Sequence, residues 1–170
     1  VSFKLEDLAK ANGILHESAH EALSDVRATI GLARLIKRLQ PRLFDCALCL
    51  HKKDRVRQEL HLPATAAHAK PFLPVSGMFG VDRGSIDVMR PLAQHPTNKN
   101  EIIAWDLAQD PSQLADLSVD EIRLRMFTAT ADLPEGVTRL PIKSVHVNKS
   151  PMVVSSLRTL SAEQAARWHV

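Results

Sequence analysis

A histidine and an aspartate, His20 and Asp25, stand five residues apart at the expected start of a helix. A carboxylate can ligate a divalent metal ion, and a nearby imidazole can take a proton from water, so the pair is a candidate hydrolytic site. On a continuous helix the two side chains would point about 140° apart, at about 100° per residue. They can face one site only if His20 lies in the unwound first turn. The alternative is a surface histidine and a solvated helix carboxylate, since this spacing is common by chance.

The residues around this pair predict the helix that would position it. Ser18 and Glu21 have the spacing of a capping box, in which each side chain satisfies a free backbone N–H group. Apolar residues then recur at helical spacing, and Pro41 ends the pattern because proline disfavours helical backbone in the residue before it. We therefore expect a helix from Ser18 to Gln40. A shorter helix precedes it and ends in a turn at the Asn-Gly pair 12–13.

The chain changes character after Pro41. A second helical pattern runs over residues 43–60, and a proline- and alanine-rich stretch follows it. Short apolar runs with glycine and proline between them then predict strands over 72–75, 86–89, 102–107 and 142–147. Capping-box spacing predicts two further helices, from Ser118 to about Phe127 and from Ser161 onward. The fold class is therefore α+β, with a boundary between residues 1–40 and 41–170.

The composition of the chain excludes several classes of protein. The chain has 170 residues, 45% of them hydrophobic and 24% charged, which excludes a collagen-like or wholly disordered protein. There is no apolar run of about 18 residues and no signal-peptide pattern at the start, so we expect a cytoplasmic protein that does not enter a membrane.

The formal net charge is only +3, but basic residues gather in one stretch. Eight of the 22 lysines and arginines lie between residues 34 and 57: Arg34, Lys37, Arg38, Arg42, Lys52, Lys53, Arg55 and Arg57. Such a local positive field suits a polyanion such as nucleic acid. A solvated helix face is the alternative.

Two cysteines raise a third possibility. Cys46 and Cys49, together with His51 and His61, could form a zinc site, although their spacing matches no common zinc finger. The simpler interpretation is that both cysteines are small apolar residues of a helix.

Several segments together carry a family resemblance. The stretch that runs from His20 to Asp25 resembles the third motif of the DEDDh 3′→5′ exonucleases. Further segments are similar to the bacterial exonuclease I family, whose members degrade single-stranded DNA. They are Gln-Pro-Arg-Leu-Phe-Asp at 40–45, Val-Ser-Gly-Met-Phe-Gly at 75–80, Pro-Leu-Ala at 91–93, Trp-Asp-Leu-Ala at 105–108 and Val-His-Val-Asn-Lys at 145–149.

The resemblance implies an architecture and a chemistry. Residues 1–40 would be the C-terminal helical end of an RNase H-like exonuclease domain, and residues 41–170 an SH3-like β-barrel domain with inserted helices. In such enzymes four carboxylates hold two Mg2+ ions for phosphodiester hydrolysis in DNA repair and recombination. Asp25 matches one of these carboxylates, and His20 matches the histidine that helps deprotonate water. The other three carboxylates match nothing in the chain, so we expect the chain alone to be inactive. A non-enzymatic module that binds nucleic acid or protein is the alternative.

The resemblance also assigns binding residues. The positions that would contact the DNA strand are Lys4, Lys53, Asn100, Lys143 and Asn148. Lys143 and Asn148 lie five apart on one expected strand and would face opposite sides, so we expect one of them at a bend or strand end. Lys70 matches a position that docks the acidic C-terminal tail of the single-stranded-DNA-binding protein.

Overall fold

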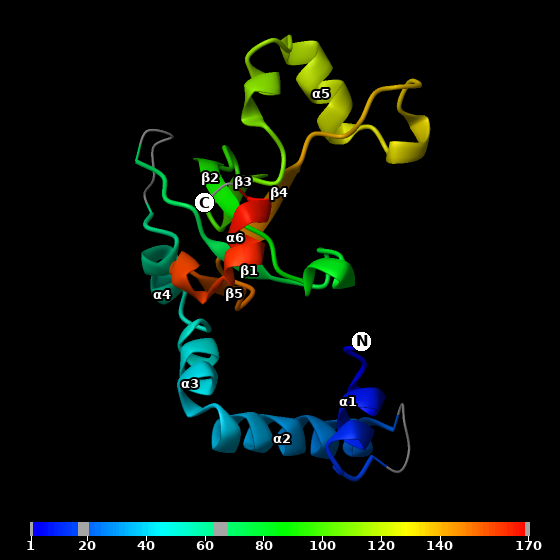
Figure 1. The fold of residues 1–170 in the computed structure, drawn as a ribbon, viewed down its shortest axis with the longest axis vertical. Coiled ribbons are helices and arrows are strands. Elements are labelled where there is room, and N and C mark those ends of the chain that lie inside the picture. Colours follow the sequence, from blue (N-terminus) through cyan, green and yellow to red (C-terminus); the bar gives the residue numbers. More distant parts are fainter. Residues whose placement is uncertain (1, 17–20, 63–67, 169–170) are drawn as a thin grey trace. The chain divides into compact units, whose positions relative to one another are not determined.

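The computed structural model describes residues 2–16, 21–62 and 68–168. The chain forms two compact units, Val1–Cys49 and Leu50–Val170 (Figure 1). The predicted domain boundary at residues 40 and 41 lies within the first of these units and stays a prediction.

The first unit is helical. It contains α1 (Leu5–Ala11), α2 (Ala22–Leu39) and α3 (Pro41–Cys49). The predicted turn after the first helix is confirmed, because Asn12 caps α1 and Gly13 adopts a φ of 64°, a conformation that glycine reaches without steric cost. The long helix starts later than predicted. Its N-cap is Glu21, without a side-chain hydrogen bond, and Ser18 lies outside the described residues.

The end of α2 follows the prediction, but the next helix does not. The helix stops at Leu39, and Pro41 opens α3, where its missing N–H group costs nothing. The single helix predicted over 43–60 is wrong: the chain turns at residues 50–52, and a separate helix α4 covers Lys53–Glu59. Leu50, within this turn, is buried, as are Val56 and Leu60, and the helical spacing of the apolar residues does not reveal the break between them.

The second unit contains two antiparallel sheets. Strand β1 (Leu73–Val75) pairs with β5 (Met152–Val154), and the strands β2 (Met89–Gln94), β3 (Glu101–Asp106) and β4 (Ile142–His146) form a three-stranded sheet in that order. Single bridges from Phe72 to Met89 and from Val75 to Ile86 connect the sheets.

Three of the four predicted strands are confirmed with small shifts at their ends. The strand predicted over 86–89 is wrong, since Ile86 makes only a bridge and β2 begins at Met89. The strand β2 was not predicted because prolines at 91 and 96 argue against a strand in the apolar pattern of the sequence. The register shift after Pro91 accommodates the first proline. The mixture of helices and sheets confirms the α+β class.

Two predicted capping boxes open the later helices. Ser118 caps α5 (Val119–Phe127) with Glu121, and Ser161 caps α6 (Ala162–Arg167) with Gln164. The residue after α6, Trp168, packs in a buried cluster with Leu73 and Val88. In this way the last described helix is tied to β1 and to the segment before β2.

None of the described helices combines the length and the apolar character that crossing a membrane requires.

Candidate functional site

Asp25 lies in the first turn of α2, and its observed partner is His16. The Nε2 atom of His16 is 2.7 Å from Oδ1 of Asp25. The His16 side chain is only 7% exposed, whereas that of Asp25 is 41% exposed. One carboxylate oxygen is therefore engaged with a largely buried imidazole, while the aspartate as a whole still reaches solvent.

His20, the predicted catalytic histidine, lies outside the described residues. Its position relative to Asp25 stays a prediction. No motif of the sequence indicated His16, and the only signal for it is the turn predicted at the Asn-Gly pair 12–13. The chain turns at Gly13 after α1, and the residues that follow lie against α2, with Ile14 next to Gly31 and His16 next to Asp25.

A close packing contact fixes this returning segment. The Cγ2 atom of Ile14 lies 2.8 Å from the position that a Cβ atom at Gly31 would occupy. The N–H group of Ile14 also donates to the carbonyl oxygen of Ala9, at 2.9 Å. A glycine inside a helix normally costs about 1 kcal/mol relative to alanine. Here it leaves room for Ile14, and thereby sets the course of the chain two residues before His16.

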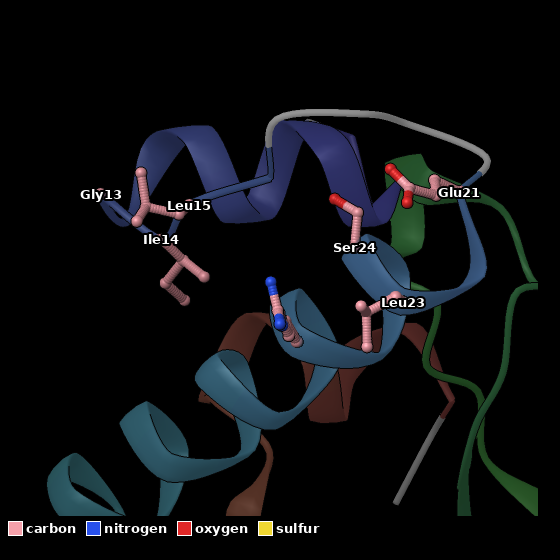
Figure 2. Close-up of a pocket in the computed structure, with 7 residues that line it drawn as sticks. Gly13, Ile14, Leu15, Glu21, Leu23 and Ser24 are labelled. Carbon is pink, nitrogen blue, oxygen red and sulfur yellow. The ribbon is translucent and has the colours of Figure 1, made fainter.

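A hollow of about 500 Å³ lies beside this site (Figure 2). Gly13, Ile14 and Leu15 line one side, and residues at the start of α2, among them Glu21, Leu23 and Ser24, line the other. Asp25 does not line it. The hollow and the Asp25 carboxylate are thus separate features at the start of α2.

The described residues do not fit a two-metal site by themselves. They contain no group of three or more His, Cys, Asp or Glu side chains placed to hold a metal ion. Asp25 offers one carboxylate, and one lone ligand holds Mg2+ poorly because this ion gives up its water reluctantly. Cys46 and Cys49 belong to the first unit and His51 and His61 to the second, so the zinc alternative stays a prediction.

In the second unit, two of the predicted strand-contacting residues, Asn100 and Asn148, lie near each other in the fold. The carbonyl oxygen of Asn100 accepts a hydrogen bond from the N–H group of Val147 at 2.8 Å, next to Asn148. Both asparagines lie at the same end of the β3–β4 ribbon, one just before β3 and the other just after β4. The expectation that one of Lys143 and Asn148 lies at a strand end is confirmed, because β4 ends at His146.

Helix α4 reaches the same end of the ribbon. Arg57 donates from Nη2 to the carbonyl oxygen of Lys99 at 2.7 Å, and Ser155 after β5 donates to the Glu59 carboxylate at 2.7 Å. Lys53 lies one turn before Arg57 on α4 and is exposed. The polar residues of α4 and of this end of the ribbon are here called the ribbon-end surface: Lys53, Arg57, Lys99, Asn100 and Asn148.

The carboxylate of Glu101 lies at this end of the ribbon, at the start of β3. Hydrogen bonds from Ser144, and to a smaller extent from Asn98, hold the pKa of Glu101 below its ordinary value. Glu101 faces His146 across the β3–β4 pair. It therefore stays ionised at neutral pH and offsets part of the positive charge at the ribbon end.

The remaining predicted residues lie elsewhere. Lys143 is exposed on β4, opposite Ala104 of β3, and Lys70 is exposed before β1. Lys4 caps α1 in the first unit, with its Nζ atom 4.0 Å from Glu6. The structure places Asn100 and Asn148 at one end of the β3–β4 ribbon and Lys53 on the helix that contacts this end through Arg57, with Lys143 further along β4.

Comparison with known proteins identifies the family. The model of the exonuclease I SH3-like domain matches residues 51–170. The chain belongs to the exonuclease I SH3-like domain family. It is 45% identical over 166 residues to exodeoxyribonuclease I of Escherichia coli K12, covering 98% of this chain and 34% of that protein. It is 42% identical over 167 residues to the enzyme of Haemophilus influenzae, with coverage of 98% and 34%.

Solved exonuclease I structures share the fold. E. coli exonuclease I in complex with a dA16 oligonucleotide matches with a TM-score of 0.84 and 44% identity, over 99% of this chain and 35% of that one. The exonuclease I of Methylocaldum szegediense matches with a TM-score of 0.86 and 40% identity, over the same shares. A further match is a zinc-bound form of the E. coli enzyme with single-stranded DNA. The chain thus spans about a third of the length of the relatives that it matches.

Proposed function

We propose that this chain supplies part of the single-strand-binding surface of a 3′→5′ exodeoxyribonuclease I. The observation that carries the proposal is the ribbon-end surface, where α4, with Lys53 and Arg57, contacts the end of the β3–β4 ribbon that carries Lys99, Asn100 and Asn148. Such side chains suit contacts with phosphate and sugar, which need positive charge and hydrogen-bond donors but carry no base code. The binding of oligonucleotides by the E. coli relative supports the same role.

For the complete enzyme we propose removal of nucleotides from single-stranded DNA in the cytoplasm, in repair and recombination. Bound divalent ions, Mg2+ in the family, would supply the activation of water and the stabilisation of the leaving oxygen. Asp25 would be one metal ligand and His20 the base. Because the described residues form no complete metal site, we propose that this 170-residue chain alone does not hydrolyse DNA.

The binding proposal is tested by fluorescence anisotropy with a labelled oligothymidylate over a series of salt concentrations. We expect weak binding. The logarithm of the association constant should fall linearly with the logarithm of the salt concentration, because each phosphate contact releases counterions. Lys53→Gln should lower the steepness of this line by about 0.7, the value for one contact on a single strand. Lys10→Gln, an exposed lysine of α1, is the matched control. Affinity that does not change with salt would contradict the proposal.

A second proposed partner is the acidic C-terminal tail of the single-stranded-DNA-binding protein. Lys70 is exposed and so available to a carboxylate. The competing non-enzymatic function, a module that binds only nucleic acid or protein, makes a different prediction. Rejoining the chain to the upstream part of an exonuclease I should restore metal-dependent nuclease activity if the enzyme assignment is correct, and leave it absent if the module stands alone.

A further inference from the structure

A second hollow lies between β4 and the β1–β5 pair, within the second unit. Its volume is about 260 Å³, and its lining comes from β1, the loop after it, β4, the turn after β4 and β5. Phe79, Met89, Val145 and Val153 are buried and form apolar walls. The hollow is slightly smaller than the roughly 300–1,000 Å³ of sites for drug-sized molecules, so its size suits a single small ring system.

Methionine is concentrated in the lining of this hollow. Three of the four methionines of the chain line this hollow: Met78, Met89 and Met152. Methionine side chains are flexible and polarisable, and their sulfur atoms make favourable contacts with aromatic rings of varied shape. Met78 is 57% exposed, whereas its neighbour Phe79 is only 3% exposed. The loop after β1 therefore presents a thioether, and not a phenyl ring, at the open side of the hollow.

The charged groups of the lining all carry the same sign. Lys143 on β4 and Lys149 in the turn after β4 both line the hollow and are both exposed, and His146 lies between them in the sequence. The described residues of the lining include no aspartate or glutamate. An apolar hollow with cationic groups at its edge is complementary to a group that is apolar and flat in the middle and anionic on both sides.

The hollow also continues the ribbon-end surface. Asn148, which belongs to that surface, directly precedes Lys149, and Lys143 lies on the strand that leads to it. A strand bound along the β3–β4 ribbon would thus pass the open side of the hollow.

From this geometry we propose that the methionine-lined hollow holds one unpaired base of single-stranded DNA, while Lys143 and Lys149 contact the phosphates on either side of that base. The proposal rests on the proposed single-strand-binding function and adds a base subsite to it. Binding of single strands without sequence preference commonly combines a positive groove with platforms for the bases, because every base has a π-face. The chain contains five phenylalanines, two tryptophans and no tyrosine. Methionine sulfur would take the role that aromatic rings have elsewhere.

The test compares two strands of equal length and charge, an oligothymidylate and a strand of abasic sites, by anisotropy at one salt concentration. We expect the complete chain to bind the strand with bases about fivefold more tightly, within the range of sulfur–aromatic contacts. Met78→Ser should bring this ratio close to one without changing affinity for the abasic strand. Lys143→Gln should weaken the binding of both strands. Met126→Ser, on α5 and outside the hollow, is the matched control and should leave both affinities unchanged.

A second measurement does not depend on affinities. A strand that carries photoreactive 4-thiothymidine should crosslink to peptides that contain residues 76–80 or 149–153, as mapped by mass spectrometry. Equal binding of both strands by the unchanged chain would overturn the base subsite and leave the proposed function intact. The absence of any strand binding would overturn both. If Met78→Ser instead abolished binding of an acidic peptide and left the base-dependent ratio unchanged, the hollow would be a peptide site and the proposal would be wrong.

Discussion

The imidazole of His16 lies against the carboxylate of Asp25, with 2.7 Å between Nε2 and Oδ1. The two residues are nine positions apart and belong to different segments, the return after α1 and the first turn of α2. The contact holds the one metal-ligand candidate of the described residues in a defined orientation. Carboxylates that ligate metal ions are in general held by hydrogen bonds from such outer partners.

Removal of this imidazole should loosen the first unit. We expect His16→Ala to lower the free energy of unfolding by about 1–2 kcal/mol, because a largely buried side chain and its hydrogen bond are both lost. Leu15→Ala is the matched control, since Leu15 is 79% exposed and should cost little. Urea unfolding followed by circular dichroism measures both variants. Equal stability of the two would show that the contact contributes nothing.

Because Ile14 packs on Gly31 of α2, replacing this glycine by alanine should not give the usual gain in helix stability. Gly31→Ala would normally stabilise a helix by about 1 kcal/mol. Here the new methyl group would meet Cγ2 of Ile14 at 2.8 Å, and the branched side chain can give way only by moving the segment that carries His16. We therefore expect no gain or a net loss in the free energy of unfolding, with Arg34→Ala as an exposed control in the same helix. A gain of the full 1 kcal/mol would contradict the packing argument.

The proposed lack of nuclease activity is tested with the purified chain. Incubation with labelled single-stranded DNA and Mg2+ should leave the strand at full length. Isothermal titration with Mg2+ should show no tight binding, because Asp25 supplies a single carboxylate. Shortening of the strand that disappears in Asp25→Asn would show that the chain is an active enzyme. Shortening that persists in Asp25→Asn would indicate a contaminating nuclease.

Docking of the acidic tail should depend on Lys70. We expect Lys70→Glu to weaken binding of a tail peptide severalfold, through the loss of one attraction and the gain of one repulsion between charges. Lys52→Glu makes the same charge change at another exposed lysine and controls for net charge. Unchanged peptide affinity in Lys70→Glu alone would remove this residue from the partner site.

The buried Asp87 predicts an unusual dependence of stability on pH. Burial, and secondarily the nearby Asp106, raise the pKa of Asp87 from 3.8 to about 6, although Trp168 and Arg83 contact its carboxylate at 2.6 Å and 2.7 Å. An acid whose pKa is higher in the folded state binds more protons there than in the unfolded state. Its contribution to stability is therefore complete below pH 4 and is lost as the pH rises to about 6.

We accordingly expect the Asp87→Asn variant, whose side chain cannot ionise, to lack this pH-dependent contribution to the free energy of unfolding. The free energy of unfolding of the unchanged chain, measured relative to the variant, should fall by up to about 2–3 kcal/mol between pH 4 and pH 7. Asp82→Asn, an exposed aspartate of the same segment, is the control. A difference that is constant over this range would show that Asp87 does not titrate there.

Local signals in the sequence determined the elements that local interactions stabilise. The capping boxes at Ser118 and Ser161 were predictable because both partners of each hydrogen bond lie within three residues. The turn at Gly13 was predictable because its positive φ of 64° is a conformation that few residues other than glycine tolerate. The family-typical segments likewise indicated exonuclease I before the fold was known, since they are specific when taken together.

Tertiary packing decided the rest, because its contacts join residues that no local pattern relates. The helix breaks at residues 50–52, where Leu50 is buried, and strand β5 is only three residues long and is paired with β1. Trp168 reaches Asp87 across 81 positions. The partner of Asp25 proved to be His16, brought there by a reversed chain, and the hollow between Met78 and Lys143 exists only because separate strands enclose it. The sequence by itself determined the family and the local elements, whereas long-range burial decided which side chains meet.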